Sequence, residues 1–237
     1  MKEIIYRRTP LSDTLNFRDL GGYATQNGGI TRWNVFFRSA CPNSINKADE
    51  ETLRNLGITD IIDLRGGDNA DEVQRGYTSL TGFNVYNIPV GGGIPPKTVS
   101  ECPESYLQIA ESERMRDVFK IIAEAKGAVL FHCFAGKDRT GVVAALLLML
   151  ADVYDEDIIA DYTLSYTYFL SRIRSDFLRF DAEKDVFKPL PDHMEGFMRV
   201  FREKYGDVRS YLLQAGFANS QINAIVGKFV VGKERKK

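Results

Sequence analysis

Residues 128–151, AVLFHCFAGKDRTGVVAALLLMLA, decide the fold of this chain. Residues 128–132 are a short apolar run that ends on one polar side chain, which is typical of a buried β-strand. The strand leads into Cys133, a six-residue loop follows at 134–139, and a helix begins near Thr140. Because residues 140–151 are apolar on nearly every side, we expect this helix to be buried.

The loop between this strand and this helix is suited to binding an anion. Sites in open α/β sheets form at the carboxyl ends of strands. A loop that runs into a helix N-terminus directs several backbone N–H groups inward and adds the positive end of the helix dipole. Arg139 adds a planar guanidinium that can bind two phosphate oxygens together. These surroundings favour the thiolate of Cys133, which is a nucleophile for covalent phosphoryl transfer.

The spacing of Cys133 and Arg139 is a weak signal alone, because a pair six residues apart arises by chance in many chains. Neither Cys41 nor Cys102 has an arginine six residues later. The full string HCFAGKDRTG, with a strand before it and a helix after it, is far more specific.

Strands and helices alternate on both sides of this segment. The pattern predicts strands at 35–38, 59–64 and 84–90, helices at 46–56 and 105–125, and a loop at 91–96. Such alternation implies crossover connections and a largely parallel sheet with helices on both faces. Beyond residue 151 the chain is expected to be helical throughout. Residues 163–195 are either part of the core or a helical lid or insertion.

The motif at 132–141 resembles the active-site loop of the cysteine-dependent protein tyrosine phosphatases. With Lys137 and Asp138 inside the loop, it is similar to the bacterial tyrosine and phosphoinositide phosphatases, some of which are triple-specificity enzymes. Further motifs of that branch occur in the family's order. They are NFRDLGGY at 16–23, FFRSA at 36–40, GITDIIDLR at 57–65, DYTLS at 161–165 and KYGDVRSYLLQAGF at 204–217. The resemblance implies a protein-tyrosine-phosphatase-like α/β fold over one domain, residues 1–237.

The resemblance also implies roles for the residues of the loop. Cys133 corresponds to the nucleophile and Arg139 to the phosphate ligand, and the hydroxyl of Thr140 supports the leaving thiolate. His132 holds the position whose imidazole orders the loop and stabilises the thiolate. Lys137 would add positive charge for a multiply phosphorylated head group. The expected phosphate-binding set is Phe134, Ala135, Gly136, Lys137, Asp138 and Arg139.

Departure of an alcohol or phenol oxygen requires a proton donor, and two residues are candidates for this general acid. Asp138 is preferred because it lies in the loop itself. Asp63, at the end of the strand at 59–64, is the alternative, although it could instead pair with Arg65. Arg18 and Asp19 are expected to form a structural pair that supports the turn at Gly21 and Gly22, or else to act at the site.

Composition excludes several classes of protein. The chain has 237 residues, 44% hydrophobic and 27% charged, and its net charge of −1 argues against a nucleic-acid-binding protein. The longest apolar run, at 142–151, is too short to cross a bilayer. The N-terminus has no recognisable signal peptide, so the cytoplasm is the default compartment, with export lacking such a signal left open. Three cysteines suggest no disulfide framework, and a count of two histidines argues against a histidine metal site.

The sequence therefore predicts a phosphatase that needs no metal or other cofactor and works through a phosphocysteine. Its expected partners are phosphotyrosine proteins, with phosphoserine, phosphothreonine and phosphoinositides as further substrates, and phosphate or a similar oxyanion in the loop. A pseudophosphatase that binds phosphorylated ligands without turnover is the alternative, against which intact Cys133, Asp138 and Arg139 argue. A third reading, a rhodanese-like sulfurtransferase or an arsenate reductase, is disfavoured by the spacing of Cys133, Arg139 and Thr140.

Overall fold

The computed structural model describes residues 6–66, 76–91, 96–175 and 185–232, with side chains of 169–175 excepted. Its five-stranded sheet has the order β1-β3-β6-β4-β5. The strands of this sheet are β1 (Arg18–Asp19), β3 (Phe36–Ala40), β4 (Ile58–Asp63), β5 (Asn84–Asn87) and β6 (Ala128–Cys133). All neighbours are parallel except β1, which runs antiparallel to β3. The predicted, largely parallel α/β sheet is confirmed, and β6 lies at its centre.

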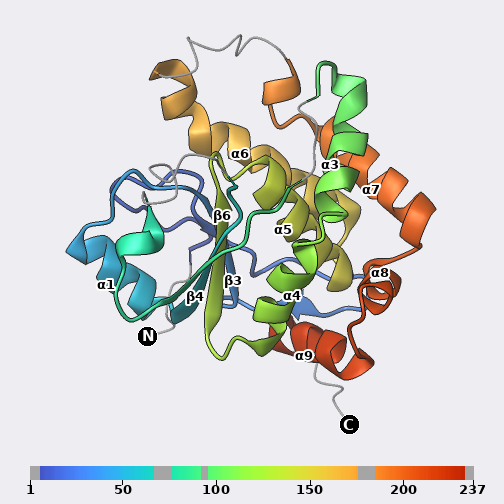
Figure 1. Ribbon diagram of the computed structural model, residues 1–237, viewed down its shortest axis with the longest axis horizontal. Coiled ribbons are helices and arrows are strands. Elements are labelled where there is room, and N and C mark those ends of the chain that lie inside the picture. The colour runs from blue at the N-terminus through green and yellow to red at the C-terminus, as the bar shows by residue number, and fades with distance from the viewer. Residues whose placement is uncertain (1–5, 67–75, 92–95, 176–184, 233–237) are drawn as a thin grey trace.

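Helices cover both faces of the sheet (Figure 1). They are α1 (Lys47–Asn55), α3 (Cys102–Ala110), α4 (Met115–Glu124), α5 (Asp138–Leu150), α6 (Asp155–Ser175), α7 (Pro191–Tyr205), α8 (Val208–Gln214) and α9 (Asn219–Phe229), with short 3₁₀ turns at Tyr77–Ser79, Val99–Glu101 and Asp185–Phe187. Helix α1 lies on one side of the strands, whereas α3, α5 and α7 lie on the other. None of the helices in the described part combines the length and apolarity needed to span a bilayer.

Alternate residues of the central strands enter two separate hydrophobic clusters. Phe36, Ile62 and Phe131 pack into the large cluster with α5. Their neighbours Phe37 and Ile61 pack into a smaller cluster on the opposite face. This alternation is the two-residue period of a strand buried on both sides. As expected from its composition, α5 is buried over almost its whole length.

Helix α1 forms where its capping signals place it. The Asn46 side chain accepts a hydrogen bond from the Asp49 backbone N–H at 2.9 Å, which satisfies one of the free N–H groups of the first turn. Gly57 follows the helix with φ of +73°, a conformation that favours glycine. The predicted helix at 46–56 is therefore confirmed, and β4 begins directly after it.

Three expectations about secondary structure were wrong or incomplete. The segment 105–125 forms two helices, α3 and α4, because the polar residues 111–114 have no apolar side to bury and the chain turns there. The part beyond 151 is not wholly helical. The strand β7 (Val230–Val231) pairs with β2 (Ile30–Thr31). Strands of two residues are too short to show the alternation of polar and apolar residues from which a strand is predicted. The strand predicted at 84–90 ends at Asn87, two residues before Pro89, which has no N–H to donate.

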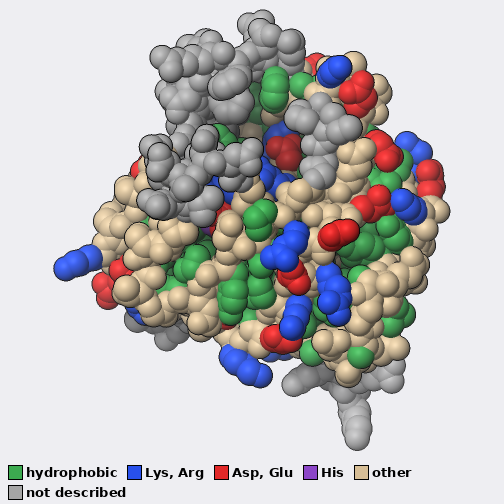
Figure 2. Space-filling view, viewed as in Figure 1, with side chains coloured by type: hydrophobic (Ala, Val, Ile, Leu, Met, Phe, Trp, Pro, Cys, Tyr) green, Lys and Arg blue, Asp and Glu red, His purple; other side chains and the backbone are tan. Residues whose placement is uncertain are grey.

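Other expectations fall partly outside the described residues. The predicted loop at 91–96 is described only at its two ends. Of the segment 163–195, the described parts are the end of α6, the turn Asp185–Phe187 and the start of α7. Helix α7 packs against both α3 and α6. On the face shown in Figure 2, Lys and Arg side chains are interspersed with Asp and Glu rather than gathered in one patch.

Candidate active site

Cys133 is the last residue of β6, at the carboxyl end of the central strand. Its side chain is buried, with 2% of the residue exposed. The ends of the neighbouring strands lie beside it, since Ala40 is in register with Cys133 and Asp63 with His132. Helix α5 begins at Asp138, two residues earlier than predicted, and its first N–H groups have no partners within the helix. The positive end of α5 thus lies next to the cysteine.

Two side chains hold the backbone of the loop from outside. Asn16 Nδ2 donates to the carbonyls of Ala135 and Gly136 at 3.1 and 3.0 Å. The Arg38 guanidinium donates to the same Gly136 carbonyl at 2.8 Å. In a trans peptide, the next N–H points opposite to the carbonyl. The N–H groups of Gly136 and Lys137 are therefore directed away from Asn16 and Arg38.

Gly136 is required at this point of the loop. Its φ is +67°, and a β-carbon here would overlap the Ser39 carbonyl at the end of β3. A side chain is therefore excluded by both conformation and space. Phe134, by contrast, is 54% exposed on the rim of the loop.

A buried ionic cluster supports Arg38. The Asp161 carboxylate binds Arg18 at 2.8 Å and Arg38 at 2.6 Å, and all three side chains are buried. Burial alone would raise the pKa of Asp161, but the two guanidinium groups outweigh it and lower the pKa to about 2. Arg18 also donates to the Asn16 backbone carbonyl and side-chain oxygen. The cluster thereby orients both donors that hold the loop.

The expected pair of Arg18 and Asp19 does not form. Asp19 does support the predicted turn, because its carboxylate accepts from the Gly21 N–H at 2.7 Å and from the Asn34 N–H at 2.7 Å. Arg18 binds Asp161 instead. Neighbouring residues of a β-strand direct their side chains to opposite faces of the sheet, so Arg18 and Asp19 point away from each other.

Arg139 and Thr140 lie in the first turn of α5. The Arg139 guanidinium donates to the Leu64 carbonyl at 3.3 Å, which brings it to the end of β4. The Thr140 hydroxyl is buried and has no hydrogen-bond partner among the described residues.

Lys137 and Asp138 are bound to each other. Lys137 Nζ lies 2.8 Å from Asp138 Oδ1, and it donates to the Val186 carbonyl at 3.3 Å. The Tyr106 hydroxyl donates to the same Oδ1 at 2.7 Å. Burial alone would raise the pKa of Asp138, but Lys137, Tyr106 and Arg139 together hold it below its ordinary value.

Asp63 is enclosed by different partners. Arg65 binds both of its carboxylate oxygens, with the shortest distance 2.7 Å. The His132 Nδ1 lies 3.8 Å from Asp63 Oδ1. Burial lowers the pKa of His132 to about 4, so the imidazole is neutral at neutral pH. The His132 Nδ1 also lies 3.4 Å from the Cys133 carbonyl, so the imidazole contacts the backbone of the expected nucleophile.

A cavity of about 380 Å³ opens beside Asp138 and Arg139. Its remaining lining is largely apolar and aromatic: Val90, Pro96, Ser105, Tyr106, Ile109, Lys137, Val186 and Phe187. The cavity adjoins the start of α5, where Lys137, Asp138 and Arg139 form part of its lining.

The chain matches the tyrosine phosphatase family over residues 9–231. It belongs to this family. Among curated relatives, it is 27% identical over 213 residues to a tyrosine-protein phosphatase of Nostoc commune, covering 81% of this chain and 72% of the relative. It is 28% identical, over an alignment 269 positions long, to the triple specificity protein phosphatase PtpB of Mycobacterium tuberculosis, covering 90% of this chain and 95% of the relative.

A more distant likeness exists among solved structures. The core catalytic domain of the PP-IP phosphatase SIW14 from S. cerevisiae, in complex with citrate, matches 76% of this chain and 99% of its own. The identity is 17% and the TM-score is 0.41. The family assignment rests on the sequence match, and it confirms the tyrosine phosphatase that the sequence predicts.

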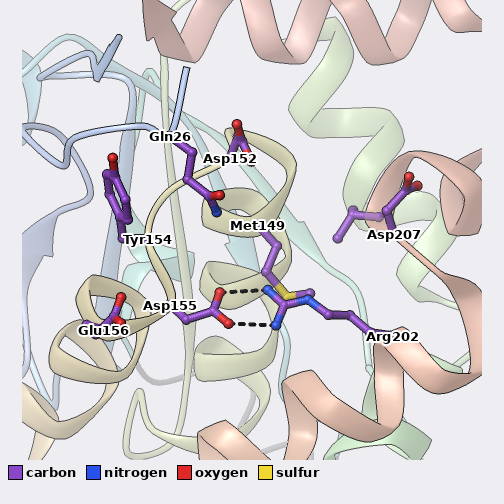
Figure 3. A pocket seen from close by; sticks show the side chains of 9 residues that line it. Gln26, Met149, Asp152, Tyr154, Asp155, Glu156, Arg202 and Asp207 are labelled. Atoms are coloured by element: carbon purple, nitrogen blue, oxygen red, sulfur yellow. Dashed lines mark hydrogen bonds and ion pairs between the residues drawn. The ribbon is translucent and has the colours of Figure 1, made fainter. Parts of the chain in front are cut away.

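This tyrosine phosphatase also has a cavity of about 490 Å³ at the opposite end of α5, near Met149 (Figure 3). Acidic side chains line it, and Asp155 forms a two-pronged pair with Arg202 at 2.6 and 2.7 Å. The loop at 134–139 runs into the first turn of α5, so this cavity is separate from the loop.

Several residues of the site were not predicted. Asn16, Arg38 and Asp161 lie inside the motifs NFRDLGGY, FFRSA and DYTLS. The available signal was that each is a polar residue within a motif of the resembled family. The contacts of Asn16 and Arg38 with the loop join residues 98 to 120 positions apart, which no local pattern shows. Tyr106 carries no such signal, because it lies in a stripe of apolar residues of the kind that predicts a buried helix face.

Proposed function

We propose that this tyrosine phosphatase hydrolyses phosphotyrosine in proteins through a phosphocysteine formed on Cys133. The observation that carries the proposal is the loop after β6, whose carbonyls at Ala135 and Gly136 are held outward by Asn16 and Arg38. The N–H groups left facing the other way, with Arg139 and the dipole of α5, can hold the equatorial oxygens of a phosphoryl group.

Two displacements at phosphorus complete the reaction. The Cys133 thiolate attacks, an S–P bond forms, and the P–O bond to the phenol breaks while the phenol oxygen takes a proton from Asp138. Water then attacks phosphorus, gives its proton to Asp138, and the S–P bond breaks to return the thiolate. The buried Thr140 hydroxyl, which lacks a partner among the described residues, is suited to donate to that thiolate.

Two contacts favour Asp138 over Asp63 as the general acid. Both oxygens of Asp63 are bound by Arg65. Within the described part of the chain, nothing hydrogen-bonds to Asp138 Oδ2, which leaves that oxygen available to a leaving group. The low pKa of Asp138 in the free protein does not prevent this role, because an arriving phosphate dianion raises the pKa of a neighbouring carboxyl.

The substrate proposal rests on the lining of the cavity beside Asp138. A phenol ring can bury itself against Val90, Ile109 and Val186, whereas the hydroxyl groups of an inositol would need polar partners there. Lys137 is not freely presented to a second phosphate, since its ammonium already binds Asp138 and the Val186 carbonyl. Both observations favour phosphotyrosine over phosphoinositides. The apolar lining also favours it over phosphoserine and phosphothreonine, which have no ring to bury.

The test compares wild type and Cys133→Ser in EDTA with a reductant. The substrates are a phosphotyrosine peptide, a phosphoserine peptide of the same sequence and a soluble phosphoinositide. We expect wild-type activity, highest on phosphotyrosine, and none from Cys133→Ser, which should still bind phosphate. Phosphate binding by wild type without turnover of any substrate would instead establish the pseudophosphatase reading. A preference for the phosphoinositide would overturn the substrate proposal alone.

A further inference from the structure

Three buried side chains form a line behind Asp138. The Tyr106 hydroxyl, on α3, lies 2.7 Å from Asp138 Oδ1 and 2.6 Å from the Tyr162 hydroxyl on α6. The Tyr162 hydroxyl in turn lies 3.5 Å from Nδ1 of His193 on α7. All three residues are at most 2% exposed. The line therefore runs from the protein interior to the partly exposed carboxylate in the loop.

The number of protons available sets the direction of this chain of hydrogen bonds. A tyrosine hydroxyl has one proton, and Tyr106 gives its proton to the Asp138 carboxylate. Tyr162 must then donate to Tyr106, and only a proton on His193 Nδ1 can bind the oxygen of Tyr162. The proton count therefore places a proton on Nδ1 of His193, and burial lowers the pKa of this imidazole. Every donor in the chain points towards Asp138.

The chain distinguishes the two oxygens of Asp138. Oδ1 accepts from both Tyr106 and Lys137, so a proton added there would meet two donors. Oδ2 has no partner among the described residues. A proton on Asp138 is therefore bound to Oδ2, where it meets no other donor. A carboxyl held in this way offers one oxygen, in one orientation, to the leaving group.

We propose that Tyr106 and Tyr162 are positioning residues that hold the Asp138 carboxyl with Oδ2 towards the leaving oxygen. The inference rests on the proposed acid role of Asp138. It adds that side chains from three helices, α3, α6 and α7, fix the orientation of that acid. Helix α7 packs on both α3 and α6, so the spacing between Tyr106, Tyr162 and His193 is set by the packing of the helices. Tyr106 also lines the cavity proposed for the phenol ring, and the positioning role concerns only the hydroxyl of each tyrosine. Each acts only through Asp138.

The test uses two substrates that differ in how much they need an acid. Phenyl phosphate releases a strongly basic oxygen, whereas 4-nitrophenyl phosphate releases a stable anion that leaves without a proton. The parameter to measure is kcat/KM, because it reports the steps up to cleavage of the P–O bond. The variants are Asp138→Asn, Tyr106→Phe and Tyr162→Phe. The matched control is Tyr211→Phe, which removes a buried hydroxyl that donates to the Ala110 carbonyl, away from Asp138.

We expect Asp138→Asn to lower kcat/KM on phenyl phosphate by about a hundredfold or more, with a far smaller effect on 4-nitrophenyl phosphate. Tyr106→Phe should lower kcat/KM on phenyl phosphate about tenfold and leave the other substrate within about threefold. Tyr162→Phe should show the same selectivity more weakly. Tyr211→Phe should change both substrates equally or not at all.

The outcomes separate the two proposals. If Asp138→Asn affects both substrates alike, the acid role itself is wrong. If Asp138→Asn is selective but Tyr106→Phe lowers both substrates equally, Tyr106 serves only the fold and the positioning role is overturned. Circular dichroism and thermal unfolding of each variant establish that it is folded. A selective loss in a folded Tyr106→Phe supports the positioning role.

Discussion

At the scale of single residues, Asn16 has two separable functions. It adopts φ of +59°, a conformation that asparagine tolerates better than most residues, and its amide holds two carbonyls of the phosphate loop. Asn34 has the same φ of +59° without a contact to the loop. The two asparagines therefore allow the backbone contribution to be measured apart from the contribution of the amide.

We expect both Asn16→Ala and Asn34→Ala to lower the free energy of unfolding by about 1 kcal/mol through the backbone. Asn16→Ala should cost about 2 kcal/mol more, because the Ala135 carbonyl loses its donor and the buried Arg18 loses an acceptor. It should also lower kcat/KM by about tenfold or more, because the phosphate loop is held less firmly in its position. Urea unfolding and steady-state kinetics of the two variants check this. Equal activity in both would show that the amide does not position the loop.

At the scale of elements, the strand β6, its loop and α5 form one unit that depends on Gly136. We expect Gly136→Ala to lower kcat/KM by about a hundredfold or more, because the new β-carbon overlaps the Ser39 carbonyl and displaces the loop. Gly206→Ala is the control. Gly206 has φ of +76°, and nothing in the described part lies within 4 Å of the place of its β-carbon.

Gly206→Ala should lose about 1 kcal/mol of unfolding free energy through its backbone and keep its activity. The measurement is kcat/KM on an aryl phosphate together with chemical unfolding of both variants. A fully active Gly136→Ala would contradict the close approach of the loop to β3.

The elements also show what a sequence can predict. Residues 128–151 predict β6, the loop and α5 because each has its own local signal: an apolar run, a Cys and Arg at fixed spacing, and a buried helix. The break between α3 and α4 was not predictable from the apolar stripe, which continues on both sides of residues 111–114. A stripe reports which side is buried and not where the axis turns.

At the scale of the whole molecule, the cluster of Arg18, Arg38 and Asp161 joins the N-terminal segment to α6 and to the loop. Arg18 and Asp161 are 143 positions apart, and the sequence carries no sign of their pairing beyond the motifs that contain them. The cysteine and arginine of the loop carry a local signal in their spacing, whereas the residues that orient the loop reach it through long-range contacts of this kind, which no local pattern shows.

Asp161 should make the stability of the protein depend on pH. Its pKa is lowered from 3.8 to about 2 by the two arginines, against the effect of burial. The unfolded chain therefore takes up the proton first, and the stabilisation is present above about pH 4 and is lost as the pH falls towards 2. At neutral pH, Asp161→Asn should lower the free energy of unfolding by about 3–5 kcal/mol, since two buried guanidinium groups lose their counter-ion.

The control for this cluster is Asp155→Asn, which breaks the exposed pair with Arg202 seen in Figure 3. It should cost about 1 kcal/mol or less, because water screens an exposed pair. Thermal or urea unfolding between pH 7 and about pH 3 measures both variants. The difference between wild type and Asp161→Asn should shrink at the acidic end, and a difference that grows there would contradict the ionised state of Asp161.

The central claim is that phosphorus becomes bonded to Cys133 during turnover. Asp138→Asn with radiolabelled 4-nitrophenyl phosphate tests it most directly, because the first step needs little acid with this substrate, whereas the second step loses its base. Rapid quenching in the first turnover should trap about one labelled phosphoryl group per chain, located on the peptide that contains Cys133. The same experiment with the additional change Cys133→Ser should trap none. Release of nitrophenol with no label on the protein would mean that water attacks the substrate directly, and would contradict this account.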